Sequence, residues 1–343
     1  MTYLKKSWLK TVSVLLLFFS FYFSASASNS NPWSPVRERA FATKAMQDAR
    51  TIIPKKYKTF SLNLSELQVL LSTAPMRFTE AADNQAVVLN LPMPNGVMQR
   101  FQIFDAPIME YELAVKFPMI HSYAGVGLDD PSASLRFDVT PYGFHALVLS
   151  ARQGSVYIDP YSKADTEHYI SYYKSDFEKE NNDFMCHVES DTNVDIDADA
   201  DVNSLLQGDC QLRTYRLALT CTGEYAAFHG GTIAGVLSAM NTTMTRVNGV
   251  YEREINVTMV IVANNENLIF LDAATDPYND GSPGQMIGEC HTQCNAIIGS
   301  ANYDIGHVFS TGGGGLAGLG VVCSSGSKGN GVTGTTNPVG DPY

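Results

Sequence analysis

The sequence predicts two unlike folding units, an antiparallel β-rich domain followed by an α/β domain. Between residues 77 and 175, short stretches of alternating apolar and polar residues are separated by turns rich in Pro, Gly and Asp. This pattern is typical of antiparallel strands. After residue 210 the predicted order becomes strand, helix, strand, helix, strand, which indicates helices layered on a sheet. The acidic stretch 189–209 between them lacks the apolar residues for a core, so we expect a linker there.

The first residues predict a secretory signal peptide. Three lysines precede the apolar run Val12–Phe23, and Ala25-Ser-Ala27 offers a cleavage site of small residues. An apolar run of this length is short for a bilayer span, although a retained membrane anchor is the alternative. We therefore expect residues 1–28 to be removed and the remaining chain to be secreted, with no membrane span left.

The domain expected over residues 29–188 is predicted to be mostly strands. Ser61–Ser65 is predicted to form a strand that leads into a helix, with Leu67, Leu70 and Leu71 on one side. A hairpin follows, with its turn at Pro92–Gly96. The predicted strands after that first one are Ala86–Leu91, Met98–Phe104, Leu135–Val139, Phe144–Leu149 and Ser155–Ile158.

The domain expected over residues 210–343 has two predicted helices. Thr232 can cap the first, and Pro283 begins the second, in which Ile287, Cys290, Cys294, Ile297 and Ile298 share one face. The predicted strands of this domain are Arg213–Thr222, Ile255–Val262, Asp304–Ser310 and Leu316–Val322.

All six cysteines lie in the second half of the chain, at positions 186, 210, 221, 290, 294 and 323. In an exported chain we expect disulfides, and six cysteines allow 15 connectivities, among which the sequence does not choose. Cys290 and Cys294 are one helical turn apart, so each is expected to bridge to another element. A metal bound by the segment Cys290–Cys294 is the alternative to a structural helix.

Several function classes have little support. A net charge of −12 argues against nucleic acid as a partner. Gly313–Gly318 matches the dinucleotide pattern G-x-G-x-x-G, but a strand and a turn follow it instead of the required helix. The aspartates of the linker resemble the start of a calcium loop, with Ala200 where Gly is needed and Leu206 where Glu is needed. H-E-x-x-H and G-x-S-x-G are absent, and His307 is expected to be a core residue.

Four segments together resemble secreted reprolysin-like zinc metallopeptidases of the metzincin clan. They are 213–225, 240–248, 303–310 and the glycine-rich 312–322. The resemblance covers about residues 210–343 and implies an α/β catalytic domain with a mixed sheet, here incomplete. It also implies that the upstream β-rich region, 29–188, is a prodomain, so that the fold class is an α+β prodomain followed by that domain.

The resemblance further implies zinc as cofactor and proteins or peptides as substrates, hydrolysed by metal-activated water with a glutamate as base. The family's zinc helix, H-E-x-x-H-x-x-G-x-x-H, is expected just beyond Tyr343. No catalytic residue or metal ligand can therefore be assigned within these 343 residues. We expect this chain alone to be inactive, with a poorly stable C-terminal half. The oligomeric state stays open.

One strand can be assigned a role by this resemblance. Gly315, Leu316, Ala317, Gly318, Leu319 and Gly320 correspond to the edge strand that pairs with substrate backbone, which agrees with the open edge that so many glycines would leave. Cys186 is a candidate for a thiolate that holds zinc in the latent precursor, and a plain disulfide is the alternative. A secreted binding or adhesion protein without enzyme activity is the alternative function.

Overall fold

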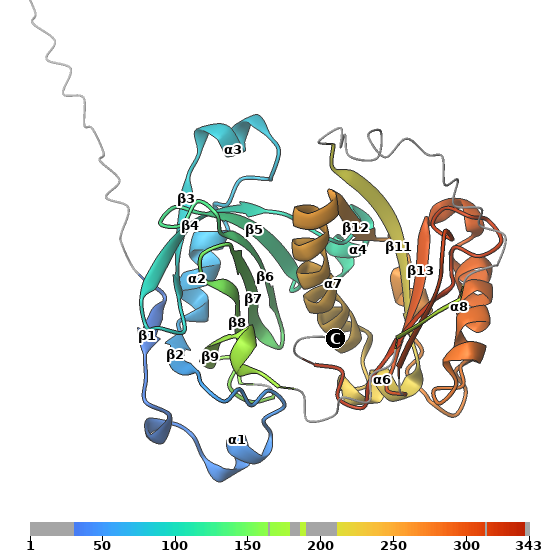
Figure 1. The fold of residues 1–343 in the computed structure, drawn as a ribbon, viewed down its shortest axis with the longest axis horizontal. Coiled ribbons are helices and arrows are strands. Elements are labelled where there is room, and N and C mark those ends of the chain that lie inside the picture. Colours follow the sequence, from blue (N-terminus) through green and yellow to red (C-terminus); the bar gives the residue numbers. More distant parts are fainter. Residues whose placement is uncertain (1–30, 164, 179–185, 190–210, 313, 340–343) are drawn as a thin grey trace, which may run out of the picture. The chain divides into compact units, whose positions relative to one another are not determined.

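The computed structural model describes residues 31–163, 165–178, 186–189, 211–312 and 314–339, arranged as two β-sheets with helices (Figure 1). These residues all lie within one unit, Asn31–Tyr343. None of the helices among them is long and apolar enough to span a bilayer. The expected linker, 189–209, lies outside the described residues except for Glu189, and so do the signal peptide and Cys210.

The N-terminal sheet has nine strands, and every neighbouring pair in it is antiparallel. Its strands are β1 (Trp33–Pro35), β2 (Lys58–Leu62), β3 (Val87–Pro92), β4 (Met98–Asp105), β5 (His121–Gly127), β6 (Ser134–Thr140), β7 (Gly143–Ser150), β8 (Gly154–Pro160) and β9 (His168–Tyr173). Their order in space is β1-β2-β9-β8-β7-β6-β5-β4-β3. The helices of this region are α1 (Lys44–Asp48), α2 (Leu64–Leu71), α3 (Glu80–Asn84) and α4 (Tyr111–Lys116), with short 3-10 turns at Glu38–Ala40 and Lys174–Asp176.

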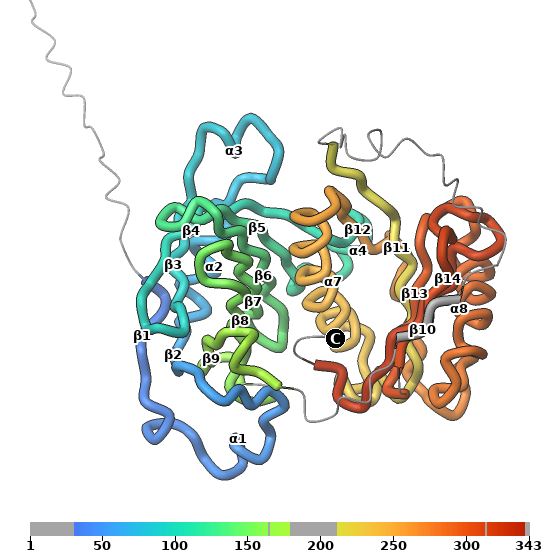
Figure 2. Tube along the Cα trace, viewed as in Figure 1, coloured from blue at the N-terminus to red at the C-terminus, as the bar shows by residue number. Residues whose placement is uncertain are grey.

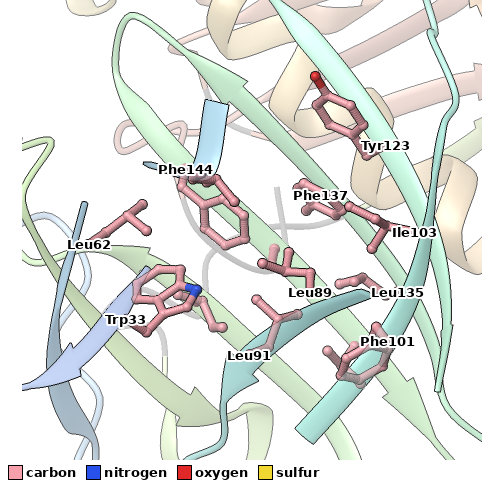
Figure 3. Packing of buried hydrophobic residues seen from close by; sticks show 14 of the residues in the cluster. Trp33, Leu62, Leu89, Leu91, Phe101, Ile103, Tyr123, Leu135, Phe137 and Phe144 are labelled. Atoms are coloured by element: carbon pink, nitrogen blue, oxygen red, sulfur yellow. The ribbon is translucent and has the colours of Figure 1, made fainter. Parts of the chain in front are cut away.

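This sheet curls around its main core. Trp33 of β1 and Leu91 of β3 belong to one buried cluster (Figure 3), although their strands stand at opposite ends of the strand order. The Trp33 ring meets the rings of Phe144 and Tyr169 edge-on, at 5.2 and 5.3 Å between centroids. α2 begins at Asn63, whose side chain accepts a hydrogen bond from the Glu66 amide, and it buries two leucines in this cluster.

The C-terminal sheet has six strands in the order β10-β14-β15-β13-β11-β12. They are β10 (Cys186–Glu189), β11 (Arg213–Cys221), β12 (Val257–Ile261), β13 (Ile305–Ser310), β14 (Gly314–Gly318) and β15 (Gly331–Gly334). Figure 2 labels β11, β13 and β14 within this sheet. The pair β14–β15 is antiparallel and all others are parallel, so the sheet is mixed. An N-terminal antiparallel sheet followed by a mixed sheet with helices is the layout predicted from the sequence.

Helices cover both faces of the mixed sheet. α6 (Gly223–Phe228) and α7 (Ile233–Ile255) pack on one face, where Leu217 and Leu219 of β11 point. α8 (Pro283–Ile297) packs on the other face, where Ala218 points, because successive strand residues alternate between the two sides. Short 3-10 turns lie at Asn265–Leu268 and Ser300–Asn302.

The structure corrects several expected boundaries. α7 continues to Ile255, so the strand predicted to begin there begins at Val257. The strand expected over Leu316–Val322 is β14, which ends at Gly318, and Gly320 takes a φ of +69° in the following turn. Ile297 on α8 is 37% exposed instead of facing the core. The division into domains stays a prediction; β10, which spans residue 188, pairs within the C-terminal sheet.

Two long strands were not predicted at all. β5 and β9 lack clean alternation because both of their faces are covered. In β5, Tyr123 enters the main core, and the adjacent Ser122 faces α7, where its hydroxyl donates a hydrogen bond to Asn241. A strand buried on both sides has no polar face to give a two-residue period.

Candidate substrate-strand site

The residues expected to pair with substrate lie on β14 and the turn after it. β14 contains Gly315 to Gly318, while Leu319, 57% exposed, and Gly320 lie in the turn. Leu316 is buried against α8, which fixes the strand from one side. β15 fixes it from the other side, since Gly315 pairs with Thr333 and Leu316 with Val332.

β14 is not the edge of the sheet in this structure, because β10 pairs with it. The pairing is parallel, with Cys186 opposite Gly315, His187 opposite Leu316, and on to Glu189 opposite Gly318. The open edge expected from the sequence is therefore occupied by a segment of the same chain. The candidate latency residue, Cys186, is the first residue of this added strand.

The glycines around β14 are required by close contacts within the chain. A Cβ on Gly312 would lie 1.6 Å from the backbone oxygen of Asp280, and one on Gly334 would lie 2.2 Å from the oxygen of Gly312. Asp280 holds this corner, because its carboxylate accepts from the hydroxyl of Thr222 at 2.8 Å and from the amide of Thr311 at 3.0 Å. These close backbone contacts lie within the chain, between the ends of β13 and β15 and the loop at Asp280.

The four described cysteines outside β10 are free thiols, which corrects the expected disulfides at these positions. Cys221, Cys290 and Cys294 are buried and Cys323 is exposed. The sulfurs of Cys290 and Cys294 are 4.0 Å apart, both within the core beneath α8. Their shared helical face was predicted correctly, but the face buries them as small apolar side chains. Burial raises the pKa of the Cys221 thiol to about 12.

The residues that the structure describes do not fit a zinc ion. They contain no group of three or more His, Cys, Asp or Glu side chains placed to hold a metal. His307, on β13, has its Nε2 2.8 Å from the Thr333 hydroxyl, and burial lowers its pKa to about 4. It is packed within the sheet, as the sequence predicted, and no step of a metal-dependent reaction can be derived from this chain.

Comparison with protein families gives one finding. Residues 211–343 match the model of the reprolysin-like metallopeptidases, family M12B. This C-terminal segment belongs to that family. The reprolysin-like segment includes all strands of the mixed sheet except β10, together with α6, α7 and α8. No curated protein matches the chain.

The reprolysin-like segment contacts the nine-stranded sheet mainly through α7, which lies beside β6 and β7 and also packs on β12 (Figure 1). Glu252 of α7 forms ion pairs with Arg77 and Arg136, and Arg246 of α7 pairs with Asp159 at 2.6 Å. These contacts were not predictable from the sequence, because each joins residues more than 80 positions apart and no motif marks them.

Small and amide side chains of α7 fit the same interface. Asn241 accepts from the Ser122 hydroxyl at 2.9 Å, and its amide donates to Asp138 at 3.4 Å. Gly249 lies against Arg136, since a Cβ there would be 3.1 Å from the arginine Cγ. The interface therefore combines close packing with paired polar groups, and the helical period used in the sequence prediction detected only the apolar face of α7.

Proposed function

We propose that this chain is part of the precursor of a secreted, zinc-dependent endopeptidase, whose zinc-binding residues lie outside these 343 residues. The family match over residues 211–343 is the observation that carries the proposal. The sequence contains no H-E-x-x-H motif, so we assign the zinc-binding residues to a segment outside it. A non-enzymatic secreted binding or adhesion protein is not favoured by that match.

In this proposal β14 is the strand that binds substrate backbone, through Gly315–Gly318 and the following Leu319 and Gly320. A peptide adds to a sheet by pairing with an edge strand, and main-chain hydrogen bonds supply much of the affinity. β10 holds that position in the present structure. We therefore assign residues 186–189 as an internal strand that must leave before substrate can pair.

We further propose that the N-terminal sheet is the prodomain that positions β10. Its contacts with α7 include two buried arginine–carboxylate pairs, Arg136 with Glu252 and Arg246 with Asp159. The polar face of α7, with Glu, Asn, Thr and Arg side chains, can be hydrated after separation. Separation would also open an apolar contact, because Ile108, Met109 and Leu113 pack in one buried cluster with residues of the mixed sheet and of α7. Cys186 as a zinc-binding thiolate remains part of the proposal, and a disulfide remains its alternative.

The decisive experiment begins with the gene. The first thirty or so codons after Tyr343 should include a sequence that encodes H-E-x-x-H. The protein extended through that motif should hydrolyse a fluorescence-quenched peptide, and a zinc chelator should abolish this activity. A stop codon directly after Tyr343, or an extended protein that is folded and inactive after removal of residues 1–210, would refute the proposal.

The role of β10 needs a separate variant. In the extended protein, Val188→Pro removes a backbone donor and disfavours the strand, whereas Val188→Thr preserves strand propensity at the same position. We expect Val188→Pro to raise the initial rate of peptide hydrolysis before any cleavage, and Val188→Thr to leave it unchanged. Equal rates for both variants would show that β10 does not limit access to β14.

A further inference from the structure

A cavity of about 210 Å³ lies between the nine-stranded sheet and α7. Leu147 and Tyr157, on β7 and β8, form one wall, and Val247 on α7 forms the opposite wall. Pro338 and Val339, which follow β15, close a third side. The cavity belongs to no feature of the substrate strand, because none of its lining residues lies on β10, β14 or β15.

The size and lining of the cavity suit a small apolar group of a ligand. A dry cavity of about 150 Å³ is known to admit benzene. The present one is larger, and its walls include Ile52, Leu147, Val247 and the ring of Tyr157. Ligand sites of this kind are lined mostly by apolar side chains, with a few polar groups that set the orientation.

The charged groups inside the cavity are already paired or neutral. Arg246 is held by Asp159 at 2.6 Å, and the Nδ1 of His145 is 3.1 Å from Asp138. His229 is buried, and its pKa is lowered to about 3 by burial and by the nearby charge of Lys163, so its imidazole is neutral at pH 7. A charged group of a ligand would therefore find no counter-ion deep in the cavity.

Lys163 supplies a cation at the rim. Its Nζ donates to the backbone oxygen of Phe228 at 2.7 Å and lies 4.8 Å from the centre of the Phe228 ring. Within the described ranges, no carboxylate lies within ion-pair distance of this ammonium. The Lys163 side chain is also exposed, so an anion can reach it from solvent without loss of an existing ion pair.

We propose that this cavity binds a small molecule with an aromatic or short aliphatic body and a single carboxylate. The body would fill the space between Leu147, Tyr157 and Val247, and the carboxylate would accept a hydrogen bond from the Lys163 ammonium. Because the walls come from both the nine-stranded sheet and α7, bound ligand would also strengthen their association. This site is independent of the proposed peptidase activity.

The test is isothermal titration calorimetry on residues 29–343. The protein is titrated with 3-phenylpropionate and, separately, with its neutral analogue 3-phenylpropanamide. We expect saturable binding of the acid, and binding of the amide at least about tenfold weaker, because the amide replaces a charge-assisted hydrogen bond to Lys163 with a weaker neutral one. Lys163→Met should reduce the affinity for the acid to that for the amide. Lys56→Met, an exposed lysine outside the cavity, is the matched control and should change neither affinity.

A second variant tests the cavity itself. Ala239→Phe places a ring into the space from α7 and should abolish binding of both compounds, with the melting temperature of the free protein unchanged or raised. No saturable binding of the acid to the native chain would overturn the proposal. Binding that survives Ala239→Phe would place the ligand elsewhere, and equal affinity for acid and amide would overturn the carboxylate assignment.

Discussion

Glu252 is the residue whose loss should most weaken the attachment of the N-terminal sheet to α7. Its carboxylate lies between two arginines, and the side chains of Glu252 and Arg136 are only 10% and 6% exposed. Arg77, the second partner, is 27% exposed and lies 2.8 Å away. Burial lowers the pKa of the Arg136 guanidinium below its usual value, which shows how strongly this cation depends on its partner.

The expected magnitudes follow from this difference in burial. Glu252→Ala leaves Arg136 buried without a counter-ion, which costs about 3–5 kcal/mol of unfolding free energy. Arg77→Ala leaves the Arg136–Glu252 pair intact and removes a partly solvated pair, which costs at most about 1 kcal/mol. The double variant Glu252→Ala with Arg136→Met removes both buried charges and should recover part of the loss, because the desolvation cost of the arginine disappears.

Trp33 provides the assay. The sequence contains two tryptophans, Trp8 and Trp33. In a protein produced without the first 28 residues, the tryptophan fluorescence reports on Trp33, which is 2% exposed in the core of the N-terminal sheet. Urea unfolding followed by this signal gives the free energies of the three variants. A loss below about 1 kcal/mol for Glu252→Ala, or equal losses for Glu252→Ala and Arg77→Ala, would refute the reasoning.

Three further predictions concern the interior of the protein. Burial lowers the pKa of His229 to about 3, so its imidazole is neutral in the folded protein at pH 7. Its contribution to the unfolding free energy is complete above pH 6.5 and falls by up to about 1.4 kcal/mol per pH unit as the pH drops towards 3. His229→Gln should flatten this part of a curve of unfolding free energy against pH. Asn248 is fully buried; it accepts from the amide of Met259 at 2.9 Å and donates to the Met259 carbonyl at 2.8 Å. Asn248→Ala should lower the unfolding free energy by about 2–5 kcal/mol. Asn248→Asp should lose at least as much at neutral pH, because a buried carboxylate would face the Met259 carbonyl oxygen, and urea unfolding measures both losses. Of the four described thiols, Cys323 should react with a thiol reagent in the native protein and the three buried ones only after unfolding, as peptide mapping by mass spectrometry can show.

The elements that the sequence predicted well are those marked by local signals. The hairpin of β3 and β4, the helix capped by Thr232 and the helix that begins at Pro283 all combine a clear period with a recognisable start or turn, and all occur within a few residues of the expected positions. Each of these signals lies within the element that it predicts, so the sequence alone is enough to detect it.

The remaining features depend on contacts between distant segments. Nothing in the four residues of β10 indicates that they pair with β14 about 130 positions later, because pairing of backbones has no signature in side-chain type. The cysteines show a different limitation. The sequence places them on the correct face of α8, but whether a buried thiol bonds to another thiol depends on geometry that only the packed core defines.

The attachment of β10 has a consequence for the kinetics of activation. A four-residue strand binds weakly by itself, but a covalent connection to a docked domain gives it an effective concentration that can reach the millimolar range. If residues 186–189 block β14 as proposed, a cut between β10 and β11 does not by itself remove the block, since β10 stays joined to the nine-stranded sheet, and that sheet stays bound to α7. Activation would then follow dissociation of a noncovalent complex, so a nicked precursor would stay latent at high protein concentration and become active on dilution.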